Sequence, residues 1–122
     1  MMKVLLLTTH LNIGGVAVYT INLARSLKAK GVHVYVASSG GTLVKMVEEC
    51  GIKHTLLNIN TKCEFNPKLL GAFVQLRTFI ARNNIDIIHA HTRVTQILAN
   101  ALSATTPAAY VSTCHGFFKH RR

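Results

Sequence analysis

Gly14 and Gly15 are the first residues of this sequence whose type and position suit binding chemistry. They end a short polar loop that follows the apolar segment 3–9 and precedes a helical pattern. A helix that begins there offers N–H groups and a partial positive charge to a phosphate, and glycine has no Cβ to hold the ligand away. The loop lacks the G-x-G-x-x-G and G-K-[ST] spacings of nucleotide-binding loops, and no acidic residue directly follows the next strand pattern. A phosphate cradle and a plain packing turn both stay open.

His115 is a candidate for chemistry on a substrate. It follows the strand-like segment 109–113 by two positions and precedes Gly116. A histidine at such a place can donate a hydrogen bond to a ligand or exchange a proton near neutral pH. The alternative is a loop histidine that only caps the end of a strand.

His89 and His91 form an H-x-H pair on a strand-like segment, so their side chains should point to the same side. Together with Cys114 and His115 on a neighbouring strand, they make a zinc site conceivable. The spacing matches no closed structural zinc pattern, however, and we therefore expect no metal.

The chain has 122 residues, 49% of them hydrophobic, and a formal net charge of +10. This length suits one folded domain, and the charge favours anionic partners such as nucleotides, sugar phosphates or an anionic membrane surface. Nucleic acid is not expected, because no recognition motif is present. The basic residues predict either a membrane-facing patch or solvated helix faces; they are Arg25, Lys28, Lys30, Lys68, Arg77, Arg82, Lys119, Arg121 and Arg122.

Three cysteines without metal-type spacing, and no signal peptide, predict reduced thiols in a cytoplasmic protein. No apolar run reaches the ~18 residues that a membrane-spanning helix needs.

Strand and helix patterns alternate along the whole chain. Strands are expected at 3–9, 33–38, 54–57, 86–90 and 109–113, and helices at 15–30, 42–50, from 67 and from 92 or 93. The first helix should bury Val16, Leu23 and Leu27, and the last should bury Val94, Ile97, Leu98 and Ala101. Such alternation predicts a single domain, 1–122, of the α/β class. We expect a Rossmann-like three-layer α/β/α fold with a mainly parallel sheet of about five strands in the order 3-2-1-4-5. The loops 10–15, 89–93 and 114–116 then converge on one edge.

These pieces together resemble the acceptor-side, N-terminal domain of glycosyltransferase family 4, the retaining enzymes with the GT-B fold. The resemblance covers nearly the whole chain and rests on the order and spacing of several short motifs. They are the strand KVLLLTT, the loop Asn12-Ile13-Gly14-Gly15, the segment INLARSLKAKGVHVYV, DIIHAHT and STCHG.

The resemblance implies an enzyme of two Rossmann-like domains with the active site between them. Gly14 and Gly15 would contact the donor diphosphate, and His115 would be the catalytic histidine that contacts the donor sugar. The residues close to the sugar or acceptor would be Asn12, His91, Thr92 and Arg93.

The reaction implied is transfer of a sugar from a UDP- or GDP-linked donor to a glycan or lipid-linked acceptor, with retention at the anomeric carbon. It would need no metal and no other cofactor, and the enzyme would lie in the cytoplasm or at the inner face of the membrane. The donor-binding C-terminal domain of such enzymes is absent from these 122 residues. The chain thus looks like a truncated N-terminal domain, and we expect it to have negligible transferase activity alone.

Two other functions fit the same residues. One is a non-catalytic Rossmann-like module that binds a phosphate-bearing ligand, and the other is a half-enzyme that needs a partner chain. Titration with UDP and GDP separates the first of these from an incomplete half-site. Coding DNA that continues past Arg122 with an E-x7-E segment would favour the transferase fragment.

Overall fold

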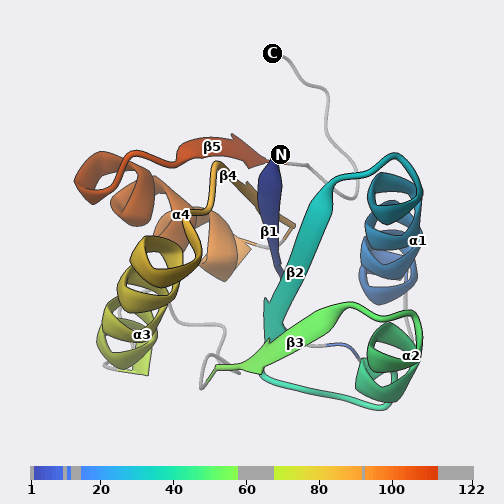
Figure 1. Ribbon diagram of the computed structural model, residues 1–122. Helices are drawn as coiled ribbons and strands as arrows, with labels where there is room; N and C mark the ends of the chain where they lie inside the picture. Colours follow the sequence, from blue (N-terminus) through green and yellow to red (C-terminus); the bar gives the residue numbers. More distant parts are fainter. Residues whose placement is uncertain (1, 10, 12–14, 58–67, 92, 113–122) are drawn as a thin grey trace, which may run out of the picture.

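The computed structural model describes residues 2–9, 11, 15–57, 68–91 and 93–112. Strands and helices alternate along this part of the chain, as predicted (Figure 1). The elements are β1 (Lys3–Leu7), α1 (Gly15–Ala29), β2 (His33–Ser38), α2 (Val44–Glu49), β3 (Lys53–Leu56), α3 (Lys68–Asn83), β4 (Ile87–Ala90), α4 (Arg93–Thr105) and β5 (Ala109–Ser112).

The strands form one five-stranded sheet in the order β3-β2-β1-β4-β5, and every pair of neighbours is parallel. β1 is the central strand: Val4 pairs with Val34 of β2 on one side and with Ile87 of β4 on the other. The predicted class and strand order are therefore confirmed. In this order the loops after β1, β2 and β4 leave the same edge of the sheet, which positions the site.

Helices α1 and α2 cover one face of the sheet, and α3 and α4 cover the other (Figure 1). Successive residues of β1 point alternately to the two faces of the sheet and pack against the helices on each side. Leu5 and Leu7 belong to the hydrophobic cluster beneath α3 and α4, while Val4 and Leu6 belong to the cluster beneath α1 and α2. Each leucine buried in this way contributes about 1.5–3 kcal/mol to the stability of the fold. Because both faces of β1 are covered by helices, the strand is apolar throughout and does not alternate with polar residues.

Helix α1 meets the sheet through other residues than those predicted, and the side chain of Val16 lies outside the description. Ala17, Ile21 and Ala24 are buried, whereas Leu23 and Leu27 are only partly buried at the margin of the same cluster. The small alanine side chains let the helix approach the strands closely, so the leucines cover the flank of the contact.

Helix α4 buries a stripe that is rotated from the predicted one. Leu98 is buried as expected, but Ile97 and Ala101 are exposed, and Ala99 and Leu102 are buried in their place. The prediction was wrong because two stripes with the same helical spacing share Leu98, and the apolar pattern does not distinguish them.

Candidate functional site

Three loops meet at the carboxyl edge of the sheet, after β1, β2 and β4. The structure places Gly15, His91 and Arg93 at this edge, because each directly follows or begins an element there. The other residues predicted for the site lie outside the described residues; they are Asn12, Gly14, Thr92 and His115.

Backbone hydrogen bonds fasten the loop after β1 to the loop after β2. The Thr9 carbonyl accepts from the amide of Ser39 at 2.9 Å and from its hydroxyl at 2.6 Å. The amide of Leu11 donates to the Gly40 carbonyl at 2.8 Å, and the Leu11 carbonyl accepts from the amide of Leu43 at 2.8 Å. Leu11 is also fully buried. Thr9 and Leu11 are therefore both held to the loop after β2, and Leu11 is the residue that precedes the glycine loop.

Gly15 is the first residue of α1 and is exposed. A Cβ built on it would meet no atom of the described residues within 4 Å, and its φ lies outside the left-handed region. Neither tight packing nor an unusual backbone conformation accounts for glycine at this position. Among the described residues, no side chain at this position stands beside the first N–H groups of the 15-residue helix.

Two helix N-termini open at this edge, those of α1 and α4, because both helices follow neighbouring central strands. Arg93 begins α4. Neither helix has an acidic residue in its first turn. The partial positive charge at each terminus is therefore not offset by a carboxylate of its own helix, which suits an anionic ligand.

His91 directly follows β4 and is buried, with 2% of its surface exposed. Its amide donates to the Leu7 carbonyl at 2.9 Å, which continues the pairing of β4 with β1 beyond the strand. Its ring lies edge-on to Tyr19 of α1, with the ring centres 5.7 Å apart. Since Tyr19 is one helical turn after Gly15, His91 reaches the same end of α1 as the glycine.

The rings of His89 and His91 are 4.4 Å apart, which confirms that both histidines point to one side of the strand. Among the described residues, no three His, Cys, Asp or Glu side chains gather as metal ligands would. Cys114, the third ligand conceived from the sequence, lies outside those residues.

Sequence reasoning gave no role to Tyr19 or to the turn at Gly40 and Gly41. Tyr19 could have been found by its spacing of four from Gly15, which places both on one side of α1. Gly40 and Gly41 carry their own signal, because they form a second glycine pair at the carboxyl end of a strand beside β1.

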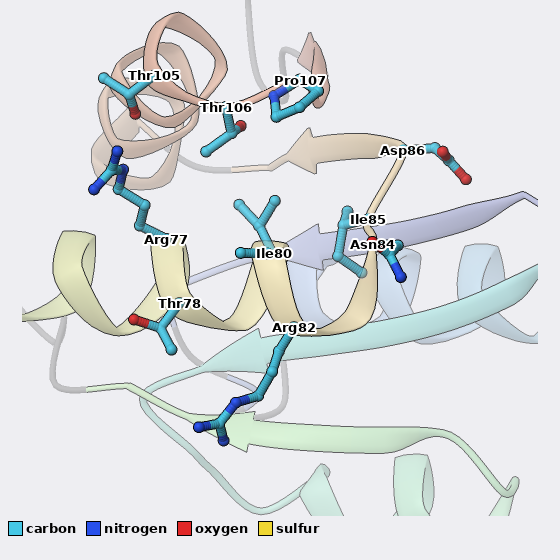
Figure 2. Close-up of a pocket in the computed structure, with 11 residues that line it drawn as sticks. Arg77, Thr78, Ile80, Arg82, Asn84, Ile85, Asp86, Thr105, Thr106 and Pro107 are labelled. Atoms are coloured by element: carbon cyan, nitrogen blue, oxygen red, sulfur yellow. The ribbon is translucent and has the colours of Figure 1, made fainter.

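A surface depression of about 820 Å³ lies at the opposite edge of the sheet. It is bordered by the end of α3, the residues before β4 and the loop between α4 and β5 (Figure 2). Arg77 and Arg82 extend in different directions, so their charges do not converge on one ligand. A smaller groove of about 190 Å³ lies between α1 and α2 and is lined by Val18, Ile21, Asn22, Arg25, Leu43 and Met46.

The basic residues of α1 and α3 lie on helices that cover opposite faces of the sheet. Arg25 and Lys28 are exposed on α1, and Arg77 and Arg82 are exposed on α3. A membrane-facing patch stays a prediction. In the described part of the chain, none of the helices combines the length and the apolar character of a membrane span.

A sequence model of Glycosyltransferase Family 4 matches residues 13–122. Comparison with curated protein sequences found no match. Among solved structures, a glycosyltransferase from Rickettsia africae is 27% identical, with a TM-score of 0.81 over 98% of this chain and 31% of that protein.

Two further solved structures are similar to this chain in fold only. MurG from Acinetobacter baumannii is 13% identical, with a TM-score of 0.68 over 92% of this chain and 34% of its own. SsfS6, a glycosyltransferase from a Streptomyces species, is 13% identical, with a TM-score of 0.64 over 92% of this chain and 39% of its own. The chain therefore spans about a third of the length of the glycosyltransferases that it matches.

Proposed function

Because the chain belongs to glycosyltransferase family 4, as the match over residues 13–122 shows, we propose that it forms the acceptor-side part of a sugar-transferring enzyme. The donor is a nucleotide-linked sugar, and the acceptor is a glycan or a lipid-linked glycan. The reaction retains the configuration of the anomeric carbon. In this proposal the carboxyl edge of the sheet, where Gly15, His91 and Arg93 lie, faces the donor.

One observation supports this assignment above the others: α1 begins with an exposed glycine, whose position has no described atom within 4 Å of where a Cβ would lie. When the bond between sugar and diphosphate breaks, negative charge grows on the departing diphosphate. The first N–H groups of α1 can donate to those oxygens, and no acidic residue in the first turn opposes them. These N–H donors, together with basic side chains, would stabilise the charge on the departing diphosphate without a bound metal or other cofactor.

The remaining residues have proposed roles around that diphosphate. Gly14 extends the N–H cradle, and His115 contacts the donor sugar. The side of the sugar and acceptor is formed by Asn12, His91, Thr92 and Arg93. The burial of His91 against Tyr19 supports its role as a fixed wall of the site.

Titration of the isotopically labelled chain with UDP, GDP and uridine, followed by NMR, tests the diphosphate site. UDP and GDP should shift the amide signals of Gly14, Gly15 and the first turn of α1, whereas uridine should not, because it has no phosphate. Shifts from UDP that are confined to the depression beside Arg77 would contradict the proposal.

A non-catalytic module that binds a phosphate-bearing ligand is the second candidate. The hydrogen bonds that hold Leu11 all come from this chain, and this favours a module that needs no second domain. Micromolar binding of UDP by the chain alone would support the module, while millimolar binding would support an incomplete donor site. A half-enzyme would instead gain affinity when its partner chain is added.

A further inference from the structure

Ser38, the last residue of β2, and His54, the second residue of β3, form a hydrogen-bonded pair that the proposed function does not use. The Ser38 hydroxyl oxygen, Oγ, lies 2.7 Å from Nε2 of His54. Ser38 is fully buried, and His54 is partly buried on the side of the sheet that α2 covers. A buried hydroxyl and imidazole this close restrict each other's orientation.

The partners of Ser38 Oγ favour one direction for this bond. The amide of Gly40 donates to the Ser38 Oγ at 3.0 Å. In the described chain Ser38 Oγ has no third partner, so we assign its single proton to the bond with His54. With this assignment Nε2 of His54 is the acceptor, and the neutral ring carries its proton on Nδ1.

The Ser38 hydroxyl thus caps a turn that only glycine forms easily. Gly40 and Gly41 have φ values of 99° and 148°, both in the left-handed region. A Cβ on Gly40 would also lie 3.3 Å from the side chain of Leu56. The Ser38 hydroxyl therefore supports this turn from within, beside the bonds that Ser39 and Gly40 make to Thr9 and Leu11.

The same turn holds the start of the glycine loop. The carbonyl of Gly40 accepts from the amide of Leu11, which stands directly before Asn12. Two hydrogen bonds, at the N–H and at the C=O of Gly40, thus connect Ser38 to Leu11. These two groups flank the Cα of Gly40, so the φ and ψ angles of Gly40 set the geometry of one bond relative to the other.

We propose that Ser38 and His54 are positioning residues, which hold Leu11, the residue before the glycine loop, through the turn at Gly40. The inference rests on the proposed function in one respect, that this loop receives a diphosphate. Neither side chain touches the ligand; Ser38 fixes the turn, and His54 fixes the Ser38 hydroxyl.

Protonation of His54 would reverse this arrangement, because Nε2 would become a donor. Ser38 Oγ would then face two donors, and its own proton would lose its acceptor. Burial lowers the pKa of His54 below the usual 6.5, against the opposing charge of Glu48 on α2. On β2 the neighbours are Val36 and Ser38, which do not titrate in this range. The neutral, accepting ring is thus the form present at neutral pH.

Amide hydrogen exchange of Leu11 in the whole 122-residue chain tests the positioning. Ser38→Ala and His54→Ala should speed the exchange of Leu11 about tenfold, because each leaves a buried polar group unsatisfied. His54→Gln, whose amide oxygen can replace Nε2 as acceptor, should keep most of the protection. Ser26→Ala and His33→Gln, at exposed positions, are the matched controls and should change nothing.

Two results would overturn the proposal. One is unchanged protection of Leu11 in Ser38→Ala, and the other is an equal loss of protection over the whole sheet, which marks a merely structural role. If Ser38→Ala fails to fold, the wild-type chain is used instead. The protection of its Leu11 amide, corrected for intrinsic exchange, should decrease as the pH is lowered through the range in which the His54 ring signals titrate. A protection factor of Leu11 that does not change while His54 titrates would contradict the proposal. The same pH dependence of Leu11 protection in His54→Gln would also contradict it.

UDP binding separates this inference from the proposed function. If the wild-type chain binds no UDP, the diphosphate site fails, and Leu11 exchange still decides the positioning. If UDP binds, Ser38→Ala should weaken binding several-fold while Ser26→Ala does not. Equal UDP affinity in a variant whose Leu11 amide exchanges rapidly would refute the claim that the turn positions the ligand loop.

Discussion

The amide of Leu11 donates a hydrogen bond of 2.8 Å to the carbonyl of Gly40. This bond makes one unit of two loops that leave neighbouring strands, β1 and β2. In many sheets each loop at the carboxyl edge varies by itself, because loops are surface segments with few constraints. Here a change in the turn after β2 reaches the residue next to the glycine loop.

Replacing Gly15 with alanine should separate folding from binding. The Cβ meets nothing within 4 Å, and φ is unstrained, so stability should stay equal or rise by up to about 1 kcal/mol. The UDP-induced amide shifts should be lost, because the methyl group would lie where the proposed diphosphate site meets the backbone. Gly71→Ala on α3 is the matched control, since a Cβ there also meets nothing. It should stabilise the helix and leave the shifts intact; equal UDP affinity in both variants would disprove the cradle.

Acidification should destabilise the fold through His54. Burial lowers its pKa in the folded chain below 6.5, the usual value, which the unfolded chain retains. Between those two pKa values the unfolded chain binds more protons, so stability increases with pH. The contribution of neutral His54 is complete above pH 6.5 and is lost as pH falls through the folded pKa. Thermal unfolding from pH 7.5 down to 5 should show a smaller fall in Tm for His54→Gln than for the wild type. Parallel curves would contradict this account.

Two leucines of α3 should respond very differently to truncation. Leu76 is fully buried between the helix and the sheet, whereas Leu70 is 70% exposed. Leu76→Ala should lower the free energy of unfolding by about 2–5 kcal/mol, because it leaves a cavity in the core. Leu70→Ala should change it by less than about 0.5 kcal/mol. Urea unfolding with equal m-values measures both, and a large effect at Leu70 would indicate that this exposed side chain is covered in solution.

The purified chain should transfer no sugar above the level of its His115→Ala variant. It spans about a third of the length of the glycosyltransferases that it resembles, and the proposed donor site needs a second domain. Release of UDP from UDP-glucose or UDP-N-acetylglucosamine, and of GDP from GDP-mannose, can be followed with a mixed glycan acceptor. Turnover that disappears in His115→Ala would show that these residues suffice for catalysis.

The strand order could be predicted because apolar strands alternate with helices, and right-handed crossovers leave few arrangements of such a chain. The predicted edge for Gly15, His91 and Arg93 followed from that order alone. The phase of α4 could not be predicted, because stripes through Ile97 and through Ala99 both fit a helix. Only the three-dimensional contact with the sheet decides between them.

The contacts of the site were less accessible to prediction. The Ser38–His54 bond joins residues 16 positions apart, and it depends on the register of β2 against β3. The sequence contains neither that register nor the left-handed turn at Gly40 explicitly. His91 was assigned to the site from its strand, but its burial against Tyr19 depends on how α1 packs.

The position of β1 in the middle of the sheet also determines the order in which its two neighbouring strands become available during translation. Val4 pairs with Val34, which is translated soon afterwards, and with Ile87, which emerges much later. Once residue 57 has emerged, β1, β2 and β3 can assemble and form the Leu11–Gly40 bond, while β4 is still thirty residues away. At ordinary elongation rates this interval lasts roughly 2–6 s. During it the strand that will become the centre of the molecule is an open edge, available to any neighbouring nascent chain. Slow codons between positions 58 and 86 would prolong that exposure and increase misassembly.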